Sequence, residues 1–216
     1  LPGSKLNFGE NLLSKNNNEK AATFISENGF RETRNWNELN QNVSKIIQFL
    51  KDDLKIKKKD RIVAYMPNTI ETVEAFIASI SLGSIWSSCS PDFGAKGAIE
   101  RFSQIKPKVL FVTNEYFYNG KRINILERID EIVKKIPSIK HVIINYYPGQ
   151  KKKREKIKLK KVKVKYWTEL MKSKPSSIIF PKFDFDQELA ILYSSGTTGK
   201  PKCICHRSGG VLLQHK

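Results

Sequence analysis

The chain has 216 residues, of which 39% are hydrophobic and 10% aromatic, enough to bury a sizeable core and unlike a disordered chain. Its formal net charge is +18, and much of the excess lies in two runs, residues 55–61 and 151–165. Neither run interleaves basic with aromatic residues, so a non-catalytic polyanion-binding module is the less favoured alternative and we expect no nucleic-acid partner.

The cysteines and the first residues favour a cytoplasmic protein. Cys89, Cys203 and Cys205 are irregularly spaced and give no disulfide framework. The opening LPGSKLNFGENLL lacks the basic start and apolar run of a signal peptide. The most apolar segment, residues 69–86, is too short and too polar to span a bilayer, so we expect a buried helix there and no membrane association.

Apolar periodicity predicts alternating strands and helices along most of the chain. A short strand at residues 20–26 and a turn at 28–30 come first, and a helix over residues 37–54 follows, with Asn37 as its N-cap. The apolar stripe of this helix consists of Leu39, Val43, Ile46, Ile47, Leu50 and Leu54. The next pattern predicts strands at 61–66, 84–89, 108–113 and 141–145, separated by helices at 69–82, 95–105 and 124–136.

Short apolar strands separated by helices predict an α/β fold with mostly parallel sheets covered by helices. The regular pattern stops after Asn145 and gives way to a long basic stretch. We interpret residues 148–165 as an insertion loop within one domain rather than as a domain boundary. The pattern resumes with an apolar strand at residues 188–194, which leads directly into the sequence SSGTTGKPK.

The residues after this strand have the composition of a polyphosphate-binding loop. Ligands of α/β sheets gather beyond the carboxyl ends of strands. Gly196 and Gly199 permit positive φ and close approach of a ligand to the backbone. The hydroxyl and ammonium groups nearby are those of Ser194, Ser195, Thr197, Thr198, Lys200 and Lys202. The spacing is neither a Walker A motif nor GxGxxG, and a flexible linker or a plain hairpin is the less favoured alternative.

The segment YSSGTTGKPK resembles the phosphate-binding signature of the adenylate-forming superfamily, with Cys203 standing where the common form has glycine. The opening LPGSKLNFGENLL, the region around SIWSSCSPDFG and the segment YFYNGK resemble the acetoacetyl-CoA synthetase family. Acetyl-CoA synthetases resemble the chain more loosely and carry a HSVVFGGFS-like stretch in place of WSSCSPDFG. The resemblance extends over essentially the whole chain. It implies that residues 1–216 are part of the N-terminal AMP-binding domain, without the C-terminal lid domain.

This resemblance implies an acid–thiol ligase. Such an enzyme activates acetoacetate with ATP to an acyl-adenylate, releases pyrophosphate, and transfers the acyl group to coenzyme A, with Mg²⁺ as the metal cofactor. A synthetase for acetate or propionate is the nearest alternative. The family's catalytic lysine and magnesium-binding glutamate correspond to sequence downstream of Lys216. We therefore expect neither a catalytic nor a metal-binding residue in this chain, and no activity from the chain alone.

The resemblance also assigns binding roles. The residues that match the ATP phosphate-binding loop are Ser194, Ser195, Gly196, Thr197, Thr198, Gly199 and Lys202. Lys121 and Arg122 lie where acetyl-CoA synthetases carry an Arg-Gly-Gly-Arg-like segment that contacts a CoA phosphate, and an ordinary basic loop is an equal alternative. Ser90, Asp92 and Phe93 stand at another strand end, where they could border the active site or the CoA tunnel.

The sequence CICH admits a zinc interpretation, which we disfavour. A closed zinc site needs four ligands, and beyond Cys203 and Cys205 the chain offers only Cys89 and three histidines. His206 is more simply interpreted as a structural residue than as part of an acyl pocket. Trp86 is expected in the core.

Overall fold

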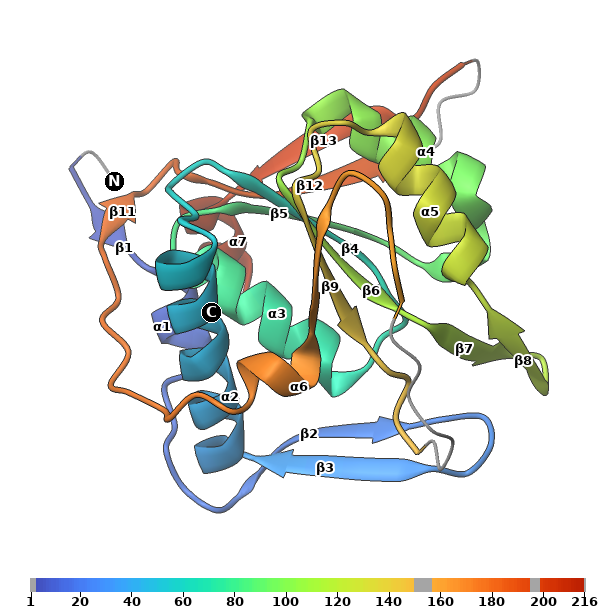
Figure 1. Ribbon diagram of the computed structural model, residues 1–216. Helices are drawn as coiled ribbons and strands as arrows, with labels where there is room; N and C mark the ends of the chain where they lie inside the picture. Colours follow the sequence, from blue (N-terminus) through green and yellow to red (C-terminus); the bar gives the residue numbers. More distant parts are fainter. Residues whose placement is uncertain (1–2, 150–156, 195–198, 216) are drawn as a thin grey trace.

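The centre of the computed structural model, which describes residues 3–149, 157–194 and 199–215, is a seven-stranded sheet. The strand order is β10-β9-β6-β4-β5-β12-β13 (Figure 1). The strands are β4 (Arg61–Tyr65), β5 (Ile85–Cys89), β6 (Val109–Thr113), β9 (His141–Asn145), β10 (Lys163–Tyr166), β12 (Glu188–Ser194) and β13 (Lys202–Arg207). Neighbours run parallel except β12 and β13, which are antiparallel. The predicted α/β fold with a mostly parallel sheet is confirmed.

Helices cover both faces of the sheet, and strand residues alternate between two hydrophobic cores (Figure 1). The helices of the first core are α2 (Trp36–Gln48) and α3 (Ile70–Ser81), and those of the second are α4 (Gly94–Ile105) and α5 (Leu126–Lys135). In β4, Ile62 and Ala64 belong to the first core, whereas Val63 and Tyr65 belong to the second. Because β4 is covered on both faces, all four side chains are fully buried.

The helix α2 begins one residue earlier than predicted, and its N-cap is Asn35 rather than Asn37. The Asn35 side chain accepts a hydrogen bond from the Glu38 amide at 2.8 Å, and the Glu38 carboxylate accepts one from the Asn35 amide at 2.9 Å. This capping box satisfies two amides at once, which a cap at Asn37 would not do. A π-helical turn (Phe49–Asp53) follows the helix. The predicted apolar stripe is buried except for Leu54, which is partly exposed.

Short elements complete the fold. The two-stranded sheets are β1 (Lys5–Leu6) with β11 (Phe183–Asp184), β2 (Lys20–Ile25) with β3 (Arg31–Asn35), and β7 (Glu115–Tyr118) with β8 (Lys121–Asn124). The short helices are α1 (Phe8–Leu12), α6 (Trp167–Leu170) and α7 (Ser208–Gln214), with a 3₁₀ turn at Pro91–Phe93. The strand predicted at residues 20–26 is β2. The hairpin of β7 and β8 was not predicted, because its sequence carries only a weak alternating pattern.

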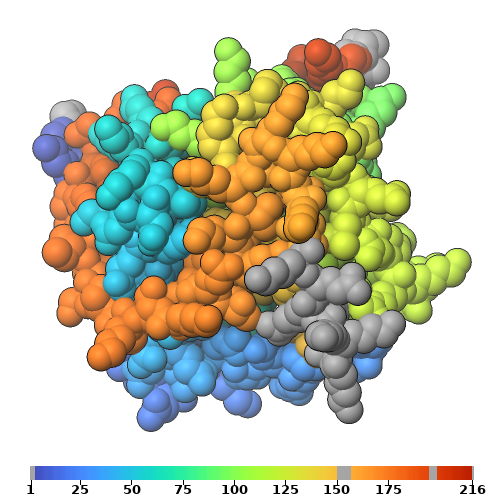
Figure 2. Space-filling model, viewed as in Figure 1, coloured from blue at the N-terminus to red at the C-terminus, as the bar shows by residue number. Residues whose placement is uncertain are grey.

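The loop predicted over residues 148–165 extends too far, because its last residues belong to β10. This strand pairs in parallel with β9 at the edge of the main sheet. Val164 packs against the second core while Lys163 is exposed, so the lysine-rich alternation is that of an edge strand. Figure 2 shows the orange part of the chain, to which β10 and α6 belong, lying across the front of the molecule. Residues 150–156 of the predicted loop lie outside the described ranges.

The most apolar helix, α3, is buried as predicted and carries two buried carboxylates. Glu74 is fully buried; its Oε1 accepts a hydrogen bond from Asn42 Nδ2 at 2.8 Å and lies 3.6 Å from Arg34 Nε. Burial raises the pKa of Glu74 to about 8, and it also raises the pKa of Glu71. No helix within the described ranges is long and apolar enough to cross a membrane.

Candidate active site

The segment predicted to bind phosphate connects β12 and β13, an antiparallel pair at the edge of the sheet. β12 runs parallel to β5, with Ala190 opposite Trp86, and Ser87 Oγ of β5 donates to the Ile191 carbonyl at 2.7 Å. β12 therefore ends at the same edge as β5, where ligands of α/β sheets gather. β12 and β13 pair as the two strands of a hairpin, the arrangement that the sequence disfavoured. The residue types between them and the position at this edge of the sheet distinguish the segment from a plain hairpin.

Two of the predicted phosphate-binding residues, Ser194 and Lys202, lie opposite each other as partners in the antiparallel register. Directly opposite side chains share one face of a strand pair, about 4.5–5.5 Å apart at Cβ. Gly199 has φ +104°, a conformation that favours glycine, and a Cβ added there would meet no atom of the described residues within 4 Å. The other predicted phosphate-binding residues lie outside the described ranges: Ser195, Gly196, Thr197 and Thr198.

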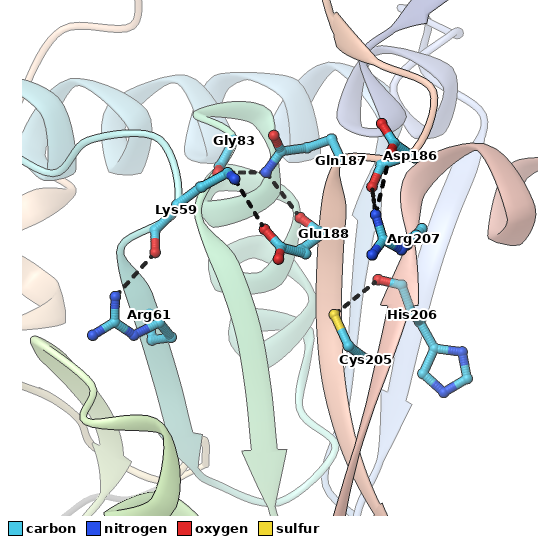
Figure 3. Close-up of polar contacts among 9 residues, drawn as sticks. All are labelled: Lys59, Arg61, Gly83, Asp186, Gln187, Glu188, Cys205, His206 and Arg207. Atoms are coloured by element: carbon cyan, nitrogen blue, oxygen red, sulfur yellow. Dashed lines mark hydrogen bonds and ion pairs between the residues drawn. The ribbon is translucent and has the colours of Figure 1, made fainter. Parts of the chain in front are cut away.

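Polar contacts hold the opposite end of this strand pair, at the start of β12 (Figure 3). Gln187 is buried, and its Nε2 donates to the carbonyl oxygens of Glu188 at 3.1 Å and Gly83 at 3.4 Å. The ion pairs at this end are Lys59 with Glu188 at 3.7 Å and Arg207 with Asp186 at 3.3 Å. This end of the strand pair is therefore joined to the loops before β4 and β5.

Arg101 of α4 joins the strand pair to the corner that follows β5. Its guanidinium carbon lies 4.3 Å from the ring centroid of Phe93 and 5.9 Å from that of Tyr193. Burial raises the pKa of Tyr193 to about 12, so the phenol stays protonated at neutral pH. Arg101 was not predicted from the sequence; the available signal was an arginine on a helix that follows a candidate strand end.

The corner between β5 and α4 carries the candidates Ser90, Asp92 and Phe93. Ser90 Oγ donates to Asp92 Oδ2 at 2.8 Å, and Phe93 is 55% exposed. The Pro91 carbonyl accepts hydrogen bonds from the Tyr65 hydroxyl at 3.0 Å and from Arg128 Nη1 at 3.1 Å. The backbone of the corner is thus fixed from β4 and α5. Arg128 is a second residue that the sequence did not predict.

Lys121 and Arg122, the predicted CoA contacts, lie in β8, away from β12 and β13 (Figure 1). Arg122 Nε donates to Glu115 Oε1 at 2.5 Å, and Glu115 is only 3% exposed. The Arg122 guanidinium therefore compensates a buried carboxylate, whereas Lys121 is exposed. The structure does not bring this pair together with Ser194 and Lys202.

An apolar pocket of about 620 Å³ lies on the α3 side of β12, which is the side opposite α4. Residues that line it include Phe76, Trp86, Leu192, Val211 and His206. Trp86 is only 5% exposed, as expected of a core residue, and it forms one wall. His206, which was expected to be structural, is partly buried in another wall. The volume is in the range of small-molecule pockets.

Cys203 and Cys205 are both exposed on β13 and form no disulfide. In the part of the chain that the structure describes, no group of three or more His, Cys, Asp or Glu side chains could hold a metal ion. We therefore assign no described residue to zinc or to Mg²⁺.

Comparison with known proteins agrees with the architecture and the signature. Residues 13–215 match the AMP-binding enzyme family. The chain is 39% identical to an acetoacetyl-CoA synthetase of Macaca fascicularis over 99% of its length, and 39% identical to an acetoacetyl-coenzyme A synthetase of Rhizobium meliloti (strain 1021) over 100%. The solved acetoacetyl-CoA synthetase from Streptomyces lividans matches 99% of the chain, with a TM-score of 0.89 and 31% identity. The chain spans 32% of each of these relatives. These residues therefore belong to the AMP-binding enzyme family.

Proposed function

We propose that the full-length protein containing this chain is an acetoacetyl-CoA synthetase. It would convert acetoacetate, ATP and CoA into acetoacetyl-CoA, AMP and pyrophosphate through an acyl-adenylate. The observation that carries the proposal is the sequence YSSGTTGKPK at the ligand-binding edge of a mostly parallel sheet. Similarity to acetoacetyl-CoA synthetases along the whole chain supports the choice of acid.

In this proposal the turn between β12 and β13 binds the phosphates of ATP. The Ser194 hydroxyl donates a hydrogen bond, and the Lys202 ammonium, on the same face, offsets the charge that develops on the leaving pyrophosphate. Gly199 lets the phosphate approach the backbone. The resemblance assigns the remaining donors of the loop to Ser195, Gly196, Thr197 and Thr198. Mg²⁺, when bound through residues elsewhere in the full-length protein, supplies further charge compensation.

For coenzyme A we propose a contact between a phosphate group and the β8 region. Lys121 is the better placed of the two candidates, because its ammonium is exposed while Arg122 is paired with the buried Glu115. We assign Arg122 to holding this hairpin and Lys121 to the ligand. The corner of Ser90, Asp92 and Phe93 would border the same substrate from the end of β5.

We further propose that residues 1–216 are part of the N-terminal AMP-binding domain and are inactive alone, with the catalytic lysine and the lid domain supplied by other sequence. The fraction of the relatives that the chain spans, 32%, supports this division. A cytoplasmic location is also proposed, and the three free cysteines support it because they fit a reducing compartment. The proposed partners are small molecules, not nucleic acid or membrane.

The experiment is a comparison of acids with the purified full-length protein. Hydroxylamine traps acyl-adenylates and acyl-thioesters as hydroxamates, so hydroxamate yield reports which acid is activated. We expect ATP-dependent hydroxamate from acetoacetate at a kcat/KM at least about tenfold above that for acetate or propionate, a difference of about 1.4 kcal/mol in transition-state binding. The isolated 216-residue chain is expected to give none.

If the full-length protein prefers acetate or propionate, that acid rather than acetoacetate is its substrate. Pyrophosphate exchange by the isolated chain would contradict the proposal that it is inactive alone. If the full-length protein gives no hydroxamate from any of the three acids, the enzyme proposal fails. Tight DNA binding at physiological salt, lost on deletion of residues 151–165 but kept when residues 194–202 are changed, would then favour a polyanion-binding module.

A further inference from the structure

One side chain of α4, Gln104, holds the start of β13 on both sides of Lys202. Gln104 Nε2 donates to the Pro201 carbonyl at 2.9 Å. On the other side of Lys202, the Cys203 thiol donates to Gln104 Oε1 at 3.6 Å. A single amide therefore bonds to the residues that directly precede and follow the lysine of the phosphate-binding signature.

The orientation of this amide follows from its neighbours. Nε2 also donates to the Glu100 carbonyl, one turn earlier in α4, at 2.9 Å. Both neighbours of Nε2 are carbonyl oxygens, which can only accept, so the nitrogen must face them and Oε1 must face the thiol. Both N–H groups and the oxygen of Gln104 are thus in use, and the side chain is fixed although it lies at the surface.

Because side chains alternate along a strand, these contacts restrict the direction of the Lys202 side chain. Successive side chains point to opposite faces, so with Cys203 on the α4 side, Lys202 projects from the other face, where Ser194 is its partner. Holding the Pro201 carbonyl and the Cys203 side chain restricts the backbone between them, and with it the direction in which the Lys202 side chain leaves. The preceding strand rests on α4 at the same register, because Tyr193 is the partner of Cys203 and lies beside Arg101.

We propose that Gln104 is a positioning residue for Lys202, and that α4 thereby sets the geometry of ATP phosphate binding. The inference rests on the proposed function. It also explains how the chain uses Cys203 where the common signature has glycine, since a glycine would offer no thiol to Gln104.

The test is a double-mutant cycle in the full-length protein, followed by acetoacetate-dependent exchange of pyrophosphate into ATP. Gln104→Met keeps the length of the side chain but cannot donate to Pro201. We expect it to raise KM for ATP about tenfold and to leave KM for acetoacetate within about twofold, the tenfold change being about 1.4 kcal/mol. In a Lys202→Met background the same substitution should have no further effect, because Gln104 acts through Lys202.

Two variants serve as controls. Gln41→Met makes the same substitution at an exposed position of α2, and KM for ATP should not change. Gln104→Glu keeps an acceptor for the Cys203 thiol but sets a carboxylate against the Pro201 carbonyl. It should therefore raise KM for ATP at least as much as Gln104→Met does. Such a result would show that the effect comes from losing the hydrogen bond to Pro201.

The inference is overturned if Gln104→Met leaves KM for ATP unchanged, or if its effect is as large in the Lys202→Met background as in the unmodified protein. Faster hydrogen exchange at the Lys202 and Cys203 amides without a change in KM would also overturn it, because Gln104 would then only stabilise the strand pair. If the unmodified protein shows no exchange of pyrophosphate at all, the proposed function itself fails, and the role of Gln104 fails with it.

Discussion

The centre of the sheet and the β12–β13 strand pair are built on different principles. In β4 and β6 every central side chain is buried between helices, whereas five of the six residues of β13 are exposed. The centre is held by apolar contact on both faces. The strand pair is held at its start by Gln187 and two exposed ion pairs, and at its turn by α4. Stability therefore resides mainly in the first region, and the binding signature in the second.

The largest expected effect is a loss of stability from the centre. Phe111 of β6 is fully buried, with ring centroids of Trp86 and Trp167 at 6.3 Å and 6.2 Å. Phe111→Ala should lower the free energy of unfolding by about 3–5 kcal/mol, because it leaves a cavity that these rings cannot fill. Leu192→Ala in β12, where the side chain is 48% exposed, should cost at most about 1 kcal/mol. Equal losses in urea denaturation would contradict the contrast between the two regions.

The second prediction concerns Glu74, a carboxyl buried in α3, one of the helices that cover the sheet. The folded-state pKa of Glu74 is about 8, above the usual value of 4.5, so the folded protein binds this proton more tightly than the unfolded chain. Stability should therefore fall as pH rises from 4.5 to about 8 and level off above that, by a few kcal/mol at most. Arg34 and Asn42 reduce the loss and Glu71 adds to it.

Glu74→Gln should flatten this pH dependence, because the amide is neutral throughout and can still bond to Asn42. The measurement is the melting temperature between pH 5 and pH 8.5, with Glu131→Gln on the exposed side of α5 as the control. A slope that persists unchanged in Glu74→Gln would assign the pH dependence to other groups.

The third prediction separates the contacts at the start of β12. Gln187→Leu removes two hydrogen bonds of a buried amide, to the Gly83 and Glu188 carbonyls, and should cost about 1–3 kcal/mol. Lys59→Met removes only an exposed ion pair with Glu188 and should cost less than about 1 kcal/mol. Thermal melts of the two variants compare these costs directly. If Lys59→Met proves the more damaging, the exposed pair rather than the buried amide secures this end.

The contrast also explains what the sequence could predict. The centre was predictable because strands such as β4 are continuous apolar runs, a pattern that burial on both faces requires. The cap of α2 was missed by two residues, since several asparagines precede the helix and only the reciprocal bond with Glu38 selects Asn35. β10 was not predicted, because the solvent-facing positions of this edge strand are lysines and its sequence therefore resembles the basic stretch before it.

The candidate site likewise contains residues that the sequence predicted and residues that it could not predict. The signature of residues 193–202 was recognisable from residue types, and the sheet places its ends at the expected edge. Arg101, Gln104 and Arg128 were not predictable, because each contacts an element distant in sequence and each looks like an ordinary polar residue of an amphipathic helix. Sequence alone also could not show that Arg122 forms an ion pair with Glu115.

The two lysines of the signature offer the sharpest test of whether the segment between β12 and β13 binds ATP phosphates. Lys202 is the partner of Ser194 in the strand pair, whereas Lys200 occupies a variable position of the signature. In acetoacetate-dependent pyrophosphate exchange by the full-length protein, Lys202→Met should raise KM for ATP at least about tenfold, the loss of a charge-assisted contact of about 1.5–3 kcal/mol. Lys200→Met should leave it within about twofold, since Lys200 precedes β13 and lies outside the paired positions of the two strands. An unchanged KM in Lys202→Met, or equal effects of the two substitutions, would show that Lys202 does not bind the phosphates of ATP.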